Sequence, residues 1–231
     1  MKSGIPYQGD TGVPPVSSET GKMPISPFVA FDPRAKVDIS RRNLPHWKQA
    51  GRTYFVTFRL ADSLPQSKLR AWREERDAWC SQHPKPWEAA TQDRYETRFI
   101  DRMQVWLDAG YGSCALARRA VREIVVGAMD YFDKQRYVLG DGVLMPNHVH
   151  VLLAPQKGYD LSSILHSWKS YTSKEINTLL GSKGTFWMDE NHDHLVRSVE
   201  QLRHYQRYIA QNPIKAGLSP DRYHWWQGSI G

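Results

Sequence analysis

Two histidines separated by one residue, His148 and His150, are the side chains in this sequence best suited to binding a metal ion. In a β-strand, residues i and i+2 point to the same face, so a strand here would bring both imidazoles together. Neutral imidazole is the commonest side-chain ligand of divalent ions. The apolar neighbours Val149, Val151 and Leu152 predict a central strand, in which a polar side chain needs a partner. The spacing alone leaves open an incidental pair with one histidine in a polar network.

A second group of reactive side chains lies near the C-terminus. Tyr208 and Asn212 are four residues apart on a predicted helix and therefore neighbours on one face, with His204 one turn earlier. A tyrosine beside a bound cation can attack a phosphate as a covalent nucleophile, and the carboxamide oxygen of Asn212 could join the ligands of the cation. The alternative is that Tyr208 packs in the core and Asn212 caps the helix.

The elements that position these residues follow from periodicity and from turn residues. The order of strand, helix, two strands and helix predicts an α+β fold, a ferredoxin-like antiparallel sheet with helices packed on one face. We predict a flexible tail over residues 1–31 and a single domain over 32–231, with a helical insertion over about 66–132. The expected strands are 52–60, 136–144 and 148–154, and the expected helices are 66–82, 92–109, 116–132, 161–180 and 198–211, the last ended by Asn212-Pro213.

Charge and composition narrow the classes of function. The chain has 231 residues and a net charge of +7, and its segment 34–59 holds seven basic residues against one acidic residue. Such a stretch, interleaved with aromatic rings, suits nucleic acid, although a solvated basic surface has the same composition. Two cysteines exclude a disulfide framework. The sequence has neither a membrane-spanning apolar run nor a recognisable signal peptide, which predicts a cytoplasmic protein without a membrane partner.

Three motifs of the sequence together resemble a known family. They are Met145-Pro-Asn-His-Val-His-Val-Leu-Leu153, His166-Ser-Trp-Lys-Ser170 and Tyr208-Ile-Ala-Gln-Asn-Pro-Ile-Lys-Ala-Gly-Leu218. This combination is similar to the REP-associated tyrosine transposases, which belong to the single-tyrosine HUH transposases. The resemblance covers about residues 41–218. It implies the HUH endonuclease fold and a transposase that cuts and rejoins single-stranded DNA at or near hairpins.

The same resemblance implies roles for individual residues. His148 and His150 correspond to the metal ligands, Tyr208 to the nucleophile that forms a 5′-phosphotyrosine, and Asn212 to the third ligand. Related insertion-sequence enzymes carry glutamine at the position of Asn212, and asparagine is one methylene shorter. The ion is expected to be magnesium or manganese, and His204 is a candidate for the assisting base. A cytoplasmic, nucleoid-associated monomer or homodimer is expected.

The expected partner is single-stranded DNA with a REP-like hairpin. Phosphate contacts are assigned by charge and position to Arg41, Arg42, Arg52, Lys169 and Lys215. Two other classes of function stay open. One is a hairpin-binding module without catalysis, in which Tyr208 is structural. The other is a metal-dependent phosphodiesterase with water as the nucleophile, for which the histidines matter and Tyr208 does not.

Overall fold

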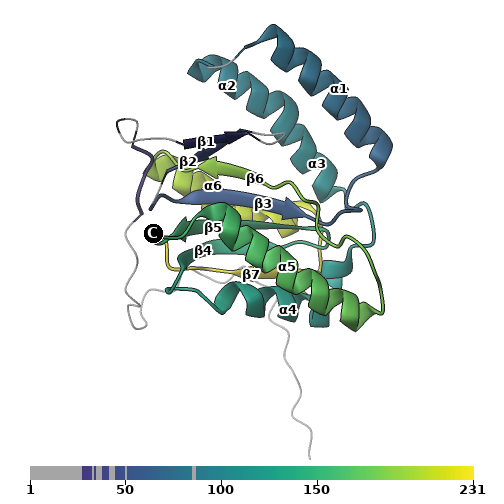
Figure 1. Ribbon diagram of the computed structural model, residues 1–231. Coiled ribbons are helices and arrows are strands. Elements are labelled where there is room, and N and C mark those ends of the chain that lie inside the picture. Colours follow the sequence, from purple (N-terminus) through teal and green to yellow (C-terminus); the bar gives the residue numbers. More distant parts are fainter. Residues whose placement is uncertain (1–27, 33, 35–37, 42–44, 50, 85–86) are drawn as a thin grey trace, which may run out of the picture.

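A five-stranded antiparallel sheet forms the centre of the molecule. The computed structural model describes residues 28–231 except 33, 35–37, 42–44, 50 and 85–86. The strand order is β6-β3-β5-β4-β7, and a separate pair, β1-β2, is also antiparallel (Figure 1). The strands are β1 (Asp38–Arg41), β2 (Pro45–Lys48), β3 (Tyr54–Arg59), β4 (Tyr137–Leu144), β5 (His148–Pro155), β6 (His192–Leu195) and β7 (His224–Trp226).

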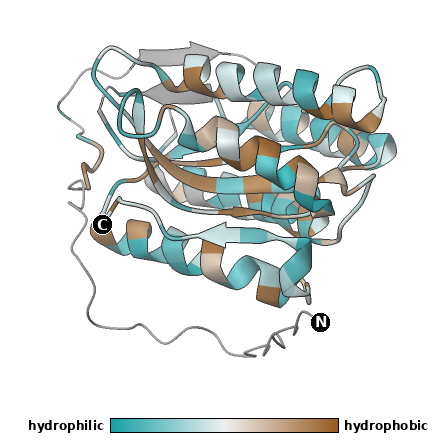
Figure 2. Ribbon diagram, turned by 90° about the horizontal axis from the view of Figure 1, so that it is seen from below, coloured by the Kyte–Doolittle hydropathy of each residue, from teal (hydrophilic) through white to brown (hydrophobic). Residues whose placement is uncertain are grey.

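Helices cover both faces of this sheet. On one face α4 (Arg119–Asp130) and α5 (Leu161–Leu180) pack against the apolar core that contains Val149, Val151 and Leu153. On the other face α6 (Val199–Lys215) packs against a second core around Phe55 and Leu152. Figure 1 shows α5 in front of the sheet and α6 behind it, and Figure 2 shows the brown, apolar strand segments between the helical layers. Successive apolar residues along a strand thus face the two cores alternately.

The chain path confirms the predicted fold class. In the order β3, α4, β4, β5, α5, β6 the strands pair as β6-β3-β5-β4, which is the split β-α-β arrangement of ferredoxin-like domains. The prediction of helices on one face holds for α4 and α5, while α6 is an additional helix on the opposite face. No helix among the described residues is long and apolar enough to span a bilayer.

The helical insertion predicted over about 66–132 follows β3, but the last helix of that range, α4, is one of the two helices of the ferredoxin-like core. The part before α4 forms a separate group of helices. It contains α1 (Gln66–Gln82), then α2 (Ala89–Tyr95), a π-helical turn (Glu96–Asp101) and α3 (Arg102–Asp108) in uninterrupted succession. Its own aromatic core contains Trp72, Trp79, Tyr95 and Phe99, all buried. Residues 1–27 of the predicted tail lie outside the described residues, so the division at residue 31 stays a prediction.

Local capping explains where two helices begin. Asp160 accepts a hydrogen bond from the Ser163 backbone N–H at 3.1 Å, and α5 ends at Gly181, whose φ is +61°. Ser198 caps α6 in the same way through the Gln201 N–H at 3.2 Å.

The prediction that α6 ends at Asn212-Pro213 is wrong. The helix continues to Lys215 with Pro213 inside it, and the Ala216 N–H still donates to the Asn212 carbonyl at 3.0 Å. Proline removes only its own N–H and disfavours helix mainly on its N-terminal side, so the helix can complete one further turn.

Candidate active site

Strand β5 places both predicted histidines on the face of the sheet that α6 covers. His148 and His150 are each 0% exposed, and their Nε2 atoms are 2.9 Å apart. Between them Val149 faces the opposite core, as strand alternation requires. The register pairs Arg59 with His148 and Thr57 with His150, so these β3 side chains share the same face.

Each imidazole has a hydrogen-bond partner behind it. The Nδ1 atom of His148 lies 2.7 Å from Asn147 Oδ1, and the Nδ1 atom of His150 lies 2.8 Å from Thr57 Oγ1. This leaves the two Nε2 atoms facing each other, 2.9 Å apart. Partners of this kind orient the histidines of metal sites and raise their basicity as ligands.

Burial keeps both imidazoles neutral at physiological pH. It lowers the pKa of His148 to about 3. The pKa of His150 is also well below its usual value, because of burial first and then the neighbouring His148 and His192. The neutral form is the one that coordinates metal ions.

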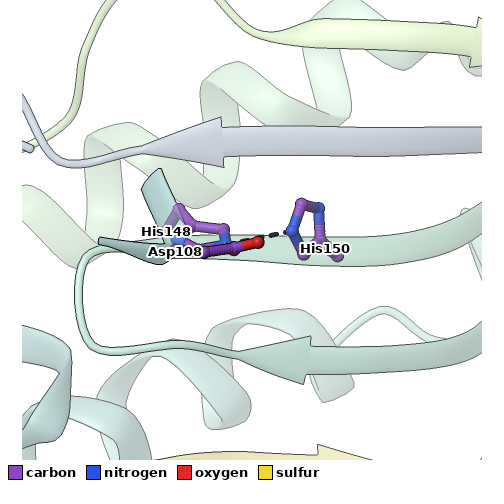
Figure 3. A group of neighbouring side chains, drawn as sticks. All are labelled: Asp108, His148 and His150. Carbon is purple, nitrogen blue, oxygen red and sulfur yellow. Dashed lines mark hydrogen bonds and ion pairs between the residues drawn. The ribbon is translucent and has the colours of Figure 1, made fainter. Parts of the chain in front are cut away.

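The helical insertion brings a carboxylate to the two histidines. Asp108, the last residue of α3, has its Oδ1 atom 3.7 Å from His148 Nε2, and one potential ligand atom from each of these three residues lies within 4.8 Å of the others. Figure 3 shows the Asp108 carboxylate beside the imidazoles. Burial raises its pKa to about 6, and interactions with Asn212 and Lys215 partly oppose that shift.

Sequence reasoning did not find Asp108. It lies on a different element from His148 and 40 residues before it, and no motif joins the two. The one feature of the sequence that could have pointed to Asp108 is its position as the last charged residue of the helix predicted over 92–109.

Helix α6 carries the predicted nucleophile over the same face. The Tyr208 ring contacts that of His150 with a centroid distance of 5.2 Å, and that of Phe55 edge-on at 5.9 Å. Its hydroxyl is buried and has no hydrogen bond of normal length to any described residue. Burial raises the pKa of Tyr208 first, the charge of Asp108 raises it further, and interaction with Asn212 lowers it.

Asn212 lies beside both of these groups. It is 2% exposed and affects the pKa of Asp108 as well as that of Tyr208. Its Oδ1 atom is buried without a hydrogen-bond partner among the described residues. A buried amide oxygen in this state costs free energy unless another group, such as a cation, binds it.

The structure also describes three further residues that the sequence analysis singled out, His204, Lys215 and Lys169. His204 is exposed on α6, and its ring contacts Tyr205. Lys215 is exposed at the end of α6, and its charge lowers the pKa of Asp108. Lys169 donates to the carbonyls of Met188 and Asp189 at 3.1 and 3.0 Å, so it holds that loop.

Three predicted phosphate contacts lie near the start of the described chain. Arg52 forms an ion pair with Asp32 at 3.6 Å. Arg41 ends strand β1, and Arg42 lies outside the described residues. Their contacts with DNA stay predictions.

Residues 192–195 form an edge strand of the sheet, β6, which the sequence analysis did not predict. In β6, His192 pairs with Thr57 and His194 with Phe55, so both histidines face the active-site side of the sheet. The Nε2 atom of His194 lies 3.2 Å from Gln201 Nε2, and its Nδ1 atom lies 3.5 Å from Glu96 Oε1. Polar residues can occupy an edge strand because the side chains find partners on neighbouring elements.

The buried His194 predicts a loss of stability in acid. Burial lowers its pKa to about 4 from an ordinary 6.5, so the unfolded chain binds the proton more readily than the folded protein. The stabilisation is present above pH 6.5 and is lost as the pH falls toward 4. Between pH 7.5 and 5 the free energy of unfolding, measured by urea denaturation, should fall by about 1–2 kcal/mol less in His194→Gln than in the wild-type protein. His204→Gln controls for loss of an imidazole from the surface, and an unchanged pH dependence in His194→Gln would contradict the expectation.

Comparison with known proteins agrees with this arrangement. The family model described as "Transposase IS200 like" matches residues 119–212, the segment that carries both histidines, Tyr208 and Asn212. No curated protein matches the chain. A solved structure entitled "Structure of the REP associates tyrosine transposase bound to a REP hairpin" aligns with 16% identity and a TM-score of 0.43, over 78% of this chain and 76% of that one. Residues 119–212 thus match the IS200-like transposase family, and the resemblance to single-tyrosine transposases that the motifs indicated is confirmed.

Proposed function

We propose that this protein is a transposase that cuts and rejoins single-stranded DNA at hairpins, with a divalent metal and a 5′-phosphotyrosine intermediate. The observation that carries the proposal is the convergence of a neutral histidine pair, a carboxylate and a tyrosine with a buried hydroxyl on one face of the sheet. The match of residues 119–212 to the transposase family supports the same conclusion.

The side chains present fit a magnesium or manganese ion. His148 and His150 offer two nitrogen atoms, and Asp108 and Asn212 each have a buried oxygen atom without a hydrogen-bond partner among the described residues. Oxygen atoms suit both ions, and imidazole favours the more borderline manganese. We therefore propose His148 and His150 as ligands, with Asp108 or Asn212 as the oxygen ligand.

The proposed reaction uses Tyr208 as the nucleophile. When bound, the ion would polarise the scissile phosphate and stabilise negative charge near the phenol. The Tyr208 oxygen forms a bond to phosphorus, the bond from phosphorus to the 3′ oxygen breaks, and the released strand end takes up a proton as a 3′-hydroxyl. Attack by another 3′-hydroxyl on the phosphotyrosine reverses the step and joins strands. One phosphodiester replaces another, so no nucleotide hydrolysis is needed.

Proton removal from Tyr208 is the step that the protein environment opposes most. Burial and the charge of Asp108 both raise the pKa of this phenol. A cation held by the adjacent histidines offsets both effects, which explains why a nucleophile of this kind lies next to the proposed metal site. His204 is exposed and has no described contact with the Tyr208 hydroxyl, so it would act from the solvent side.

The proposed DNA partner agrees with the charge of the chain, +7 overall. Lys215 beside the site and Arg52 near β3 are proposed phosphate contacts, together with Arg41, Arg42 and Lys169. A DNA-acting enzyme of this kind would work in the cytoplasm at the nucleoid.

Covalent capture of DNA tests the proposal. The protein is incubated with manganese or magnesium and a labelled library of single-stranded hairpins, then analysed by denaturing electrophoresis. We expect a protein–DNA adduct that His148→Ala abolishes and that His224→Ala, a change at an exposed histidine of β7, preserves. Cleavage without an adduct would favour the phosphodiesterase, and hairpin binding without cleavage would favour the binding module.

A further inference from the structure

A chain of hydrogen bonds runs through the two histidines from one side of the site to the other. Gln104 Nε2 lies 3.4 Å from Thr57 Oγ1, which lies 2.8 Å from His150 Nδ1. The two Nε2 atoms are 2.9 Å apart, and His148 Nδ1 lies 2.7 Å from Asn147 Oδ1. Every link of this chain needs one hydrogen atom, so the donors and acceptors can be assigned in sequence.

The Asn147 end of the chain has a fixed direction. This side chain is 1% exposed, and its Nδ2 group donates to the Leu107 and Tyr111 carbonyls, each at 3.1 Å. Carbonyl oxygens only accept, so the amide cannot turn round without losing both bonds. Its Oδ1 atom therefore faces His148, and the Nδ1 atom of His148 must carry the hydrogen.

The direction at the other histidine follows. A neutral His148 with hydrogen on Nδ1 presents a lone pair at Nε2. The bond between the two Nε2 atoms then takes its hydrogen from His150, whose Nδ1 atom accepts from the Thr57 hydroxyl. In this arrangement His148 has the form that binds metal, whereas the nitrogen of His150 that faces it, Nε2, carries a hydrogen.

We propose that Asn147 and Thr57 are positioning residues with opposite roles: Asn147 holds His148 permanently in the metal-binding tautomer, and Thr57 allows His150 to change tautomer when a cation binds. In that change the hydrogen on His150 Nε2 is lost to water and another is taken up at Nδ1, so no net proton is released. The Thr57 hydroxyl turns from donor to acceptor, which a hydroxyl can do and a doubly anchored amide cannot. This inference rests on the metal site of the proposed function.

The same amide connects the histidines to the insertion. The Leu107 carbonyl that Asn147 holds belongs to the residue directly before Asp108. The bond to Tyr111 fixes the chain just beyond α3. One side chain thus sets both the tautomer of His148 and the place of the nearby carboxylate, which makes Asn147 the link between the helical insertion and the histidine pair.

Nitrogen-15 NMR of the histidine rings tests the tautomers directly and needs no DNA. In the full chain without metal, we expect hydrogen on Nδ1 of His148 and on Nε2 of His150. Addition of magnesium chloride should move the hydrogen of His150 to Nδ1 and leave His148 unchanged. Hydrogen on Nε2 of His148 before addition, or an unchanged His150 in the magnesium-saturated protein, would overturn the inference. Failure to bind magnesium at all would instead contradict the proposed metal site.

Two substitutions separate the two roles. In Asn147→Leu, His148 loses its partner, and we expect manganese affinity, measured by calorimetry, to fall about 10- to 100-fold, as for other residues that orient metal ligands. In Thr57→Val, the affinity should fall while the ring signals of His148 keep hydrogen on Nδ1. Asn177→Leu is the matched control, because the Asn177 amide also donates to a backbone carbonyl and accepts at Oδ1, here from the Ser182 hydroxyl, but lies on α5. Unchanged affinity in a folded Asn147→Leu protein, checked by circular dichroism, would contradict the positioning role.

Discussion

Replacing Tyr208 by phenylalanine is expected to abolish the covalent protein–DNA adduct, with a loss of strand cleavage of at least about 10³-fold. The substitution removes one oxygen atom and keeps the ring that packs against His150 and Phe55. Fold and metal affinity should therefore stay close to those of the wild-type protein. The measurement is denaturing electrophoresis of a labelled hairpin after incubation with manganese.

Tyr205 provides the matched control for this experiment. It lies on the same helix, and its ring stacks on Phe55 with a centroid distance of 4.2 Å. Burial raises the pKa of Tyr205 as it does for Tyr208, but the Tyr205 ring contacts those of His194 and His204, not that of His150. Tyr205→Phe should retain the adduct. Persistent adduct formation in Tyr208→Phe would remove Tyr208 from the role of nucleophile.

A large loss of metal affinity is expected for Asp108→Asn. The amide keeps the shape of the side chain but loses the charge, so we expect manganese affinity to fall at least about tenfold, which is 1.4 kcal/mol. The pKa of Asp108, about 6 without metal, also predicts a pH dependence. The carboxylate is protonated below that value, so binding by the wild-type protein should weaken about tenfold between pH 7 and 5. Asp108→Asn should lose most of this dependence, as calorimetric titration at both pH values would show.

A second pair of variants identifies the oxygen ligand. Asp101→Asn changes a carboxylate elsewhere in the insertion, at the end of its π-helical turn, and should leave metal affinity unchanged. Asn212→Ala removes the other buried oxygen atom next to the histidines. If Asn212→Ala weakens binding and Asp108→Asn does not, Asn212 is the oxygen ligand, as the family resemblance implied.

The parts of the fold that sequence reasoning found are those with a local signal. The helix over residues 161–180 has an aspartate cap before it and a glycine after it, and the structure has the same bounds. The alternation around His148 and His150 likewise indicated a central strand. In these segments the pattern and the tertiary contacts favour the same conformation.

The parts that it missed depend on contacts between distant residues. Strand β6 is short and polar, and it is a strand because β3 pairs with it. Asp108 has no motif around it, and the docking of α3, which includes the bond from Asn147 to the Leu107 carbonyl, brings it to His148. Tertiary contacts of this kind leave no periodic pattern in the sequence.

The two ends of the sheet have a consequence for association between molecules. The edge strands β6 and β7 are only four and three residues long, and β6 carries two histidines and an aspartate. Short edges offer few free backbone groups to a second sheet, which disfavours edge-to-edge aggregation. In the five-stranded sheet the strands β3, β5 and β4 lie between these edges, so the proposed DNA-binding surface would not have to expose a template for amyloid-like pairing.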